Sequence, residues 1–134
     1  MKVFLDSSFI IAYAIESDSD YKTACNLDEK GIFNNDCYVS NLIVNEIVTV
    51  IGNKIDLKLA IDTYNAVKDN FTIINEYEIT NFNDIVIKTY QKYNTKLSFI
   101  DCAILEIMKE NKIKNLVTFD KEFKRVKNIN LIKD

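Results

Sequence analysis

Short apolar runs alternate with longer amphipathic stretches along this chain. The runs at residues 2–5, 37–39, 71–74, 116–119 and 129–132 are mostly apolar, and each is followed by a polar residue. Runs of this length are typical of buried strands, because a strand that is covered on both faces needs no polar side.

The amphipathic stretches between these runs predict helices. After Ser40, Ile43, Ile47 and Ile51 recur at helical spacing, and Gly52 with the following asparagine is expected to end that helix. The other predicted helices begin at the serines after residue 6 or cover residues 20–32, 57–67, 79–93 and 98–108, with a short helical turn at 121–126. The stretch 98–108 is apolar nearly all round, so we expect it to be the most buried helix.

Strands that alternate with helices predict an α/β fold. We expect a single three-layer domain over residues 1–134, with a mostly parallel central sheet of about five strands and helices on both faces. With 134 residues, 48% of them hydrophobic, the chain can build a real core. The longest fully apolar run, residues 9–15, is far too short to cross a membrane, and no signal peptide is visible.

Two features of the composition narrow the chemistry. The three cysteines lack metal-type spacing and are best interpreted as reduced thiols of a cytoplasmic protein. The chain has no histidine, whereas Ser-His-Asp and Cys-His catalysis and most catalytic zinc sites need an imidazole. Carboxylate and hydroxyl oxygens remain as ligands, and these hard donors suit Mg²⁺ or Mn²⁺.

The net charge of −3 argues at first against a nucleic-acid partner. The charges are unevenly placed, however: residues 1–50 hold three basic and eight acidic side chains, and residues 101–134 hold eight basic and six acidic ones. The basic last quarter can contact phosphates while a metal offsets the acids. A solvated surface of mixed lysines explains any single one of these residues equally well.

Four acids stand where the predicted structure changes. Two of them end predicted strands, one opens a helix and one lies a turn into a helix: Asp6, Asp120, Asp101 and Glu46. In an open α/β fold, residues at the carboxyl ends of strands converge on one crevice. Two carboxylates about 5 Å apart repel by on the order of 3 kcal/mol at an effective dielectric of about 20, so several in one crevice indicate a shared cation. The pattern predicts metal-dependent chemistry on phosphate.

Each acid also has a structural explanation. Ser98 and Asp101 match a capping box, Asp120 can cap the turn at 121–126, and Glu46 can be a partly exposed side chain.

Asp6 is the hardest of the four to explain in this way. We expect Ser7 or Ser8 to cap the following helix better than the acid does.

Four segments together resemble the PIN-domain nucleases. They are residues 4–8 (FLDSS), 40–46 (SNLIVNE), 97–105 (LSFIDCAIL) and 116–120 (LVTFD). Their order and spacing and the length of the chain are similar to those of the VapC-type toxins of prokaryotic toxin–antitoxin pairs, over essentially the whole chain.

The resemblance implies a Mg²⁺- or Mn²⁺-dependent endoribonuclease. The implied metal ligands are the four acids, the last of them bound directly or through water: Asp6, Glu46, Asp101 and Asp120. Ser7 stands where many relatives have threonine, and Thr118 is expected to support the site. The number of metal ions stays open.

The implied reaction is hydrolysis of RNA phosphodiesters by a metal-bound water, which leaves 5′-phosphate and 3′-hydroxyl ends. Lys121, Lys124, Arg125 and Lys127 are candidates for contacts with the RNA backbone. The resemblance further implies a homodimer and a cognate antitoxin that docks in an exposed apolar groove.

Three other classes of protein share part of this sequence pattern. A PIN-like enzyme with RNA-processing duties is scarcely separable from a toxin by sequence. A receiver-like, Mg²⁺-binding signalling module needs an acid at the end of a middle strand, where Asn75 stands after residues 71–74. A haloacid-dehalogenase-type phosphatase needs a second acid at the position of Ser8.

Overall fold

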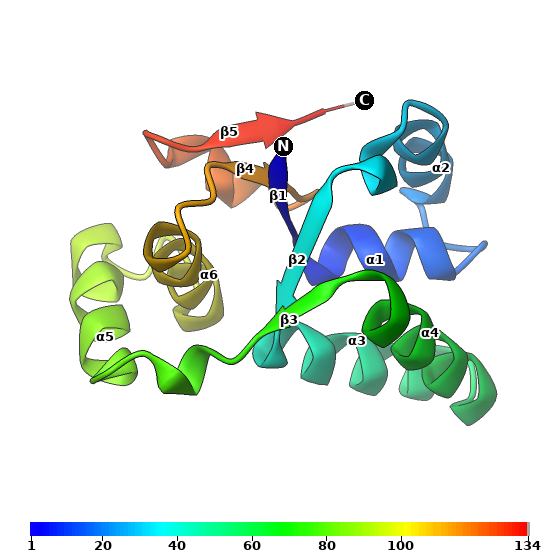
Figure 1. Ribbon diagram of the computed structural model, residues 1–134, viewed down its shortest axis with the longest axis horizontal. Helices are drawn as coiled ribbons and strands as arrows, with labels where there is room; N and C mark the ends of the chain where they lie inside the picture. Colours follow the sequence, from blue (N-terminus) through cyan, green and yellow to red (C-terminus); the bar gives the residue numbers. More distant parts are fainter. Residues whose placement is uncertain (134) are drawn as a thin grey trace.

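A computed structural model describes residues 1–133 and contains one sheet in which every pair of neighbouring strands is parallel (Figure 1). Its five strands are β1 (Lys2–Leu5), β2 (Asp36–Ser40), β3 (Thr72–Ile74), β4 (Asn115–Val117) and β5 (Asn130–Ile132). Their order in the sheet is β3-β2-β1-β4-β5, so β1 lies at the centre. The predicted α/β fold is confirmed, and the sheet is wholly rather than mostly parallel.

Helices cover both faces of the sheet. The longer ones are α1 (Ser7–Ala14), α2 (Tyr21–Glu29), α3 (Asn41–Lys54), α4 (Leu57–Asn70), α5 (Phe82–Tyr93) and α6 (Phe99–Glu110). Helices α1 to α4 pack against one another on one side, and α5 packs against α6 on the other (Figure 1). Three short 3₁₀ helices complete the chain: η1 (Ile32–Asn34), η2 (Glu76–Glu78) and η3 (Lys121–Arg125).

The core forms on the central strand, as its apolar sequence predicts. Val3, Phe4 and Leu5 have no exposed surface, and Leu116 and Val117 of the neighbouring β4 are equally buried. Strands of a parallel sheet are covered on both faces, which explains why they carry apolar runs without alternation.

Two expectations about helices are wrong. Helix α3 does not end at Gly52 but continues to Lys54, and Gly52 faces Ala60 of α4: a Cβ atom there would lie 3.8 Å from the Ala60 Cβ, in ordinary van der Waals contact. Helix α6 is less buried than α1, since its first-turn residues Phe99 and Ile100 are 36% and 38% exposed. An all-apolar sequence cannot show which turn of a helix extends beyond its neighbours.

None of the helices within residues 1–133 combines the length and the apolar character that crossing a membrane requires.

Candidate active site

Asp6 connects the central strand to the first helix. Its backbone N–H donates to the Val117 carbonyl (3.0 Å), which extends the pairing of β1 with β4 by one residue. Its carboxylate accepts from the backbone N–H of Ser7 (2.8 Å), so Asp6 is the N-cap of α1. The expectation that Ser7 or Ser8 caps this helix is therefore wrong: both lie inside its first turn, and the acid before them is the cap.

Hydroxyl groups surround the buried Asp6 carboxylate, whose residue is only 5% exposed. Ser8 Oγ and Thr118 Oγ1 both donate to its Oδ2 atom, at 3.0 and 2.6 Å. Ser8 Oγ also accepts from the Phe119 backbone N–H (3.0 Å) and lies 3.3 Å from Thr118 Oγ1. Ser8 was not among the site residues predicted from the sequence. Its position two residues after a strand-ending acid, beside a second serine, was the available signal.

Thr118 links two of the four acids. It follows β4 directly, and its hydroxyl donates to Asp6 and accepts from the Asp120 backbone N–H (3.0 Å). This contact turns the chain away from the sheet, so the strand ends at Val117 rather than at residue 119 as expected. Asp120 is the N-cap of η3, and its Oδ1 accepts from the Glu122 N–H (2.9 Å). The capping explanation for Asp120 is confirmed.

Glu46 reaches the same region from α3. It is partly buried, and its side chain shares a hydrogen bond with Ser7. The Ser7 hydroxyl also lies 3.4 Å from Asp6 Oδ1. Ser7 therefore stands between Asp6 and Glu46, as a site residue should.

A remote carboxylate fixes the start of the helix that carries Glu46. Both oxygens of Glu76, a residue with no exposed surface, accept from backbone N–H groups of α3, those of Asn41 and Leu42 (3.0 Å each). Ser40, which precedes the helix, makes no side-chain cap, and its buried hydroxyl has no hydrogen-bond partner among the described residues. No local sequence pattern predicts this role of Glu76.

Asp101 lies in the first turn of α6 and forms the predicted capping box with Ser98. Ser98 Oγ accepts from the Asp101 N–H (3.0 Å), and Asp101 Oδ2 accepts from the Ser98 N–H (3.4 Å). The capping explanation is thus confirmed for Asp101, but it occupies only one of the two carboxylate oxygens.

Electrostatics connects the four acids to one another. Burial raises the pKa of Asp6, hydrogen bonds from Thr118, Ser8 and Ser7 lower it, and the charge of Asp120 raises it further. Burial also raises the pKa of Glu46, with the Asp6 charge adding to the effect.

Two neighbouring acids act on the pKa of Asp101. Burial, the charge of Asp120 and then the charge of Asp6 raise it from 3.8 to about 6, against the opposing hydrogen bonds of Ser98. Each of the four carboxylates therefore lies within electrostatic range of at least one other.

The four acids supply the right donors for a hard divalent cation but do not form a finished coordination shell. Within residues 1–133, no three Asp, Glu, Cys or His side chains are grouped closely enough to ligate one ion as they stand. The caps at Asp101 and Asp120 each use one carboxylate oxygen. The donor chemistry and the mutual repulsion fit Mg²⁺ or Mn²⁺, and binding requires the carboxylates to draw together.

The basic residues after Asp120 do not act as one group. Arg125 pairs with Glu122, both on η3, whereas Lys127 lines a separate hollow beside α5 and α6.

Comparison with known proteins identifies the family. The model of the PIN domain matches residues 3–129, which is nearly the whole chain. The chain belongs to the PIN domain family. Among proteins with curated descriptions, none matches this PIN domain in sequence.

Solved structures share the fold of this PIN domain over almost their full length. Mycobacterium tuberculosis VapC20, a sarcin-ricin loop cleaving toxin, superposes with a TM-score of 0.82 at 18% identity, covering 98% of this chain and 99% of that one. VapBC2 from Rickettsia felis, bound to a DNA fragment from its promoter, gives 0.74 at 16% identity, covering 98% of each chain. A toxin–antitoxin complex from Klebsiella pneumoniae gives 0.69 at 17% identity, covering 98% and 96%.

Family membership excludes two of the alternatives. A receiver-like module and a haloacid-dehalogenase-type phosphatase have different folds, and the PIN domain match over residues 3–129 excludes both. The choice between a toxin and an RNA-processing enzyme is a matter of function within the family.

Proposed function

We propose that this PIN domain is a metal-dependent endoribonuclease, and that it is the toxin of a toxin–antitoxin pair. The observation that carries the proposal is the electrostatic coupling of Asp6, Glu46, Asp101 and Asp120 at one edge of a PIN-domain sheet. Such coupling costs stability in an empty site, so it is expected where a cation is to be bound.

The four carboxylates would hold Mg²⁺ or Mn²⁺, which supplies an activated water and charge neutralisation on the phosphate. Asp6 is the anchor, because Ser7, Ser8 and Thr118 fix its orientation. Because the chain has no histidine, proton transfer has to go through carboxylates or solvent.

Cleavage of labelled RNA by the purified protein tests the enzyme proposal. We expect cutting that depends on Mg²⁺ or Mn²⁺ and leaves 5′-phosphate and 3′-hydroxyl ends. Asp6→Asn and Asp101→Asn should each reduce the rate by a factor on the order of 10³ or more, whereas Asp69→Asn on the exposed face of α4 should not. Ends with 2′,3′-cyclic phosphate, or cutting that survives both substitutions, contradict the proposal.

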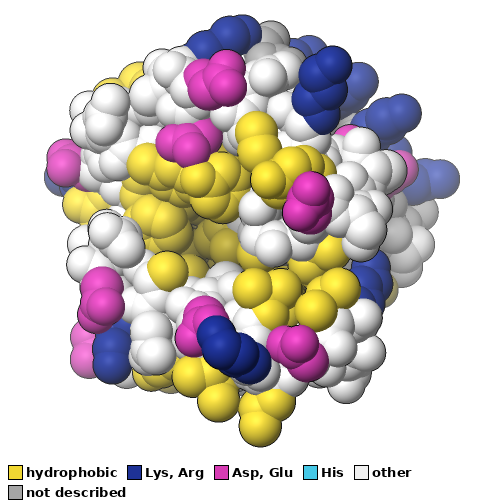
Figure 2. All heavy atoms as spheres, turned by 90° about the vertical axis from the view of Figure 1, so that its right-hand side faces the viewer, with side chains coloured by type: hydrophobic (Ala, Val, Ile, Leu, Met, Phe, Trp, Pro, Cys, Tyr) yellow, Lys and Arg dark blue, Asp and Glu magenta, His cyan; other side chains and the backbone are white. Residues whose placement is uncertain are grey.

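The toxin part of the proposal has a separate support. A groove of about 490 Å³ lies between α1 and α4, and the space-filling view from that side shows apolar side chains gathered in a hollow (Figure 2). Aromatic rings line this groove. The ring centroids of Tyr13 and Phe33 lie 5.1 Å apart, and the Phe33 ring stacks on the Phe71 ring with a centroid distance of 5.7 Å. We place the cognate antitoxin here, as an apolar segment laid across the groove.

Expression in a host cell tests the toxin role. Induction should arrest growth, and co-expression of a small protein encoded beside this gene should restore it. Ala66→Arg, which puts a charge on the exposed wall of the groove, should keep cleavage intact while abolishing the rescue. Active cleavage without growth arrest favours the RNA-processing alternative. Homodimer formation stays a prediction, to be measured by sedimentation.

A further inference from the structure

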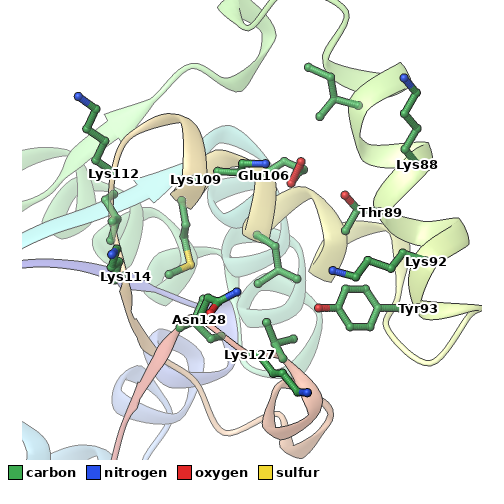
Figure 3. Close-up of a pocket in the computed structure, with 16 residues that line it drawn as sticks. Lys88, Thr89, Lys92, Tyr93, Glu106, Lys109, Lys112, Lys114, Lys127 and Asn128 are labelled. Atoms are coloured by element: carbon green, nitrogen blue, oxygen red, sulfur yellow. The ribbon is translucent and has the colours of Figure 1, made fainter.

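A second hollow, of about 670 Å³, lies between α5, α6 and the segment that leads into β5 (Figure 3). Six lysines line it: Lys88, Lys92, Lys109, Lys112, Lys114 and Lys127. Figure 3 shows them around the rim, with Lys112 and Lys114 on one side and Lys88 and Lys92 on the other. We call this hollow the lysine pocket.

The lysine pocket concentrates positive charge on a protein whose net charge is −3. Glu106 is the one acid among its described lining residues. None of the six lysines forms a salt bridge with another residue in the part of the chain that the structure describes. Six positive charges that face one hollow with a single counter-charge destabilise the fold slightly, and an anionic ligand relieves that repulsion.

The end of helix α6 fixes the backbone of Lys112 beside the pocket. Helix α6 ends in a Schellman motif: the Ile113 N–H donates to the Met108 carbonyl (2.8 Å) and the Lys112 N–H to the Lys109 carbonyl (3.2 Å). Lys112 takes the position that needs a left-handed backbone (φ 56°), where glycine is strongly preferred. Here a lysine stands in place of the residue that the local structure favours.

The floor of the lysine pocket is apolar and includes a ring. Met108 and Ile113 are buried beneath it, and Tyr93 lines its wall. Lys92 Nζ lies 5.4 Å from the centre of the Tyr93 ring, and Figure 3 shows both side chains directed into the hollow. Cations around an aromatic and apolar floor suit a single-stranded nucleic acid, whose phosphates meet the lysines while a base stacks on the ring.

Helix α6 connects this surface to the acid cluster. Asp101 lies in its first turn and Lys109 in its last, eight residues later, which corresponds to about 12 Å along the helix axis. A few nucleotides of a single-stranded RNA can bridge this distance.

We propose that the lysine pocket is a secondary binding site for the phosphate backbone of single-stranded RNA, a few nucleotides from the bond to be cut. The inference rests on the proposed nuclease function and adds the location of a substrate contact outside the acid cluster. The proposed site includes lysines of α5, α6 and the segment before β5. Of these, only Lys127 was predicted from the sequence as a candidate contact with the RNA backbone.

The test is the salt dependence of RNA binding in chelator-containing buffer, where no cutting occurs. A fluorescein-labelled oligouridylate of about 16 nucleotides is the probe. The pocket variant carries Lys88→Gln, Lys109→Gln and Lys127→Gln, one change in each of the three elements.

A matched control carries the same charge change on the other side of the molecule, at exposed positions of α2, α3 and α4: Lys22→Gln, Lys54→Gln and Lys68→Gln.

We expect the pocket variant to bind RNA about tenfold more weakly than the wild type. The slope of log K against log salt should become less steep by about 2, since each lost phosphate contact removes about 0.7 for single strands. The control variant should bind like the wild type. Lys112→Gly should also weaken binding while its melting temperature stays equal to or above that of the wild type, which a merely structural lysine does not predict.

Three results would overturn the inference. One is equal binding by the pocket and control variants while the wild type still cuts RNA, which leaves the nuclease proposal intact. Another is tighter binding of an oligoglutamate than of RNA, lost in the pocket variant, which assigns the pocket to an acidic protein segment. The third is a wild type that neither binds nor cuts RNA, which removes the nuclease proposal as well.

Discussion

The carboxyl group of Asp101 connects the acid cluster to the stability of the fold. Its pKa lies near 6 in the folded protein and near 3.8 when unperturbed, so between these values the folded state holds the proton more firmly than the unfolded state. A raised acid pKa therefore makes the protein more stable as the pH falls from neutral toward 4.

The first prediction follows from this sign. Metal-free protein should be more stable at a pH of about 5 than at about 7. Its free energy of unfolding should be higher by on the order of 1–3 kcal/mol, and its melting temperature should be higher as well. Asp101→Asn should reduce the difference, the rest of which comes from the raised pKa values of Asp6 and Glu46, and should stabilise the protein at neutral pH. Calorimetry at several pH values measures both. A melting temperature that rises with pH over this range would show that Asp101 is not under this repulsion.

A second prediction at the residue scale concerns Thr118, whose hydroxyl contacts both Asp6 and the Asp120 backbone. Thr118→Val keeps the shape but leaves a buried carboxylate with one donor fewer, which should cost about 1–3 kcal/mol of unfolding free energy. Denaturant titration provides the measurement, and Thr49→Val, at an exposed position of α3, serves as its control. If the two variants lose equal stability, Thr118 does not hold Asp6.

At the scale of elements, the placement of α3 depends on a residue outside it. Glu76→Gln leaves one carbonyl oxygen to accept from two backbone N–H groups, because the amide NH₂ cannot accept, and should destabilise the protein by about 1–3 kcal/mol. Glu78→Gln, two residues further along the same 3₁₀ helix and exposed, should be nearly neutral. The Glu76 variant should also lower the cleavage rate, because α3 carries Glu46.

The same helix shows how far sequence could predict the site. The capping box of Ser98 and Asp101 was predictable, because both partners lie within one turn. Glu76 caps a helix start 35 positions earlier in the chain, and no local pattern records such a contact. Thr118 and Asp6 lie 112 positions apart, so only the resemblance to the PIN-domain nucleases could indicate that the two residues belong to one site.

At the scale of the whole molecule, the acid cluster should couple cation binding to folding. Mg²⁺ or Mn²⁺ at a hundredfold excess over its Kd should stabilise the protein by about 2.7 kcal/mol, which raises the melting temperature by on the order of 10 °C for a chain of this size. The Asp6→Asn, Asp101→Asn double variant should show no shift. An unchanged wild-type melting temperature at millimolar metal would count heavily against the metal site.

The overall fold was largely predictable, because strands and helices alternate with clear local periods. The order of the strands was not, since it depends on which face each connecting helix covers. The chain pairs its first strand with both β2 and β4, and the β1 pairing with β4 joins residues more than a hundred positions apart, Val3 with Asn115 among them.

This central position of β1 has a consequence for the synthesis of the protein. Asp6 is made more than a hundred residues before the Val117 carbonyl and the Thr118 hydroxyl that hold it. A growing chain on the ribosome can fold β1, β2 and the helices between them, yet it lacks the second half of the acid cluster until residues 101–120 have also been made. On the proposed function, the nascent chain cannot cut RNA before these later residues have folded against β1.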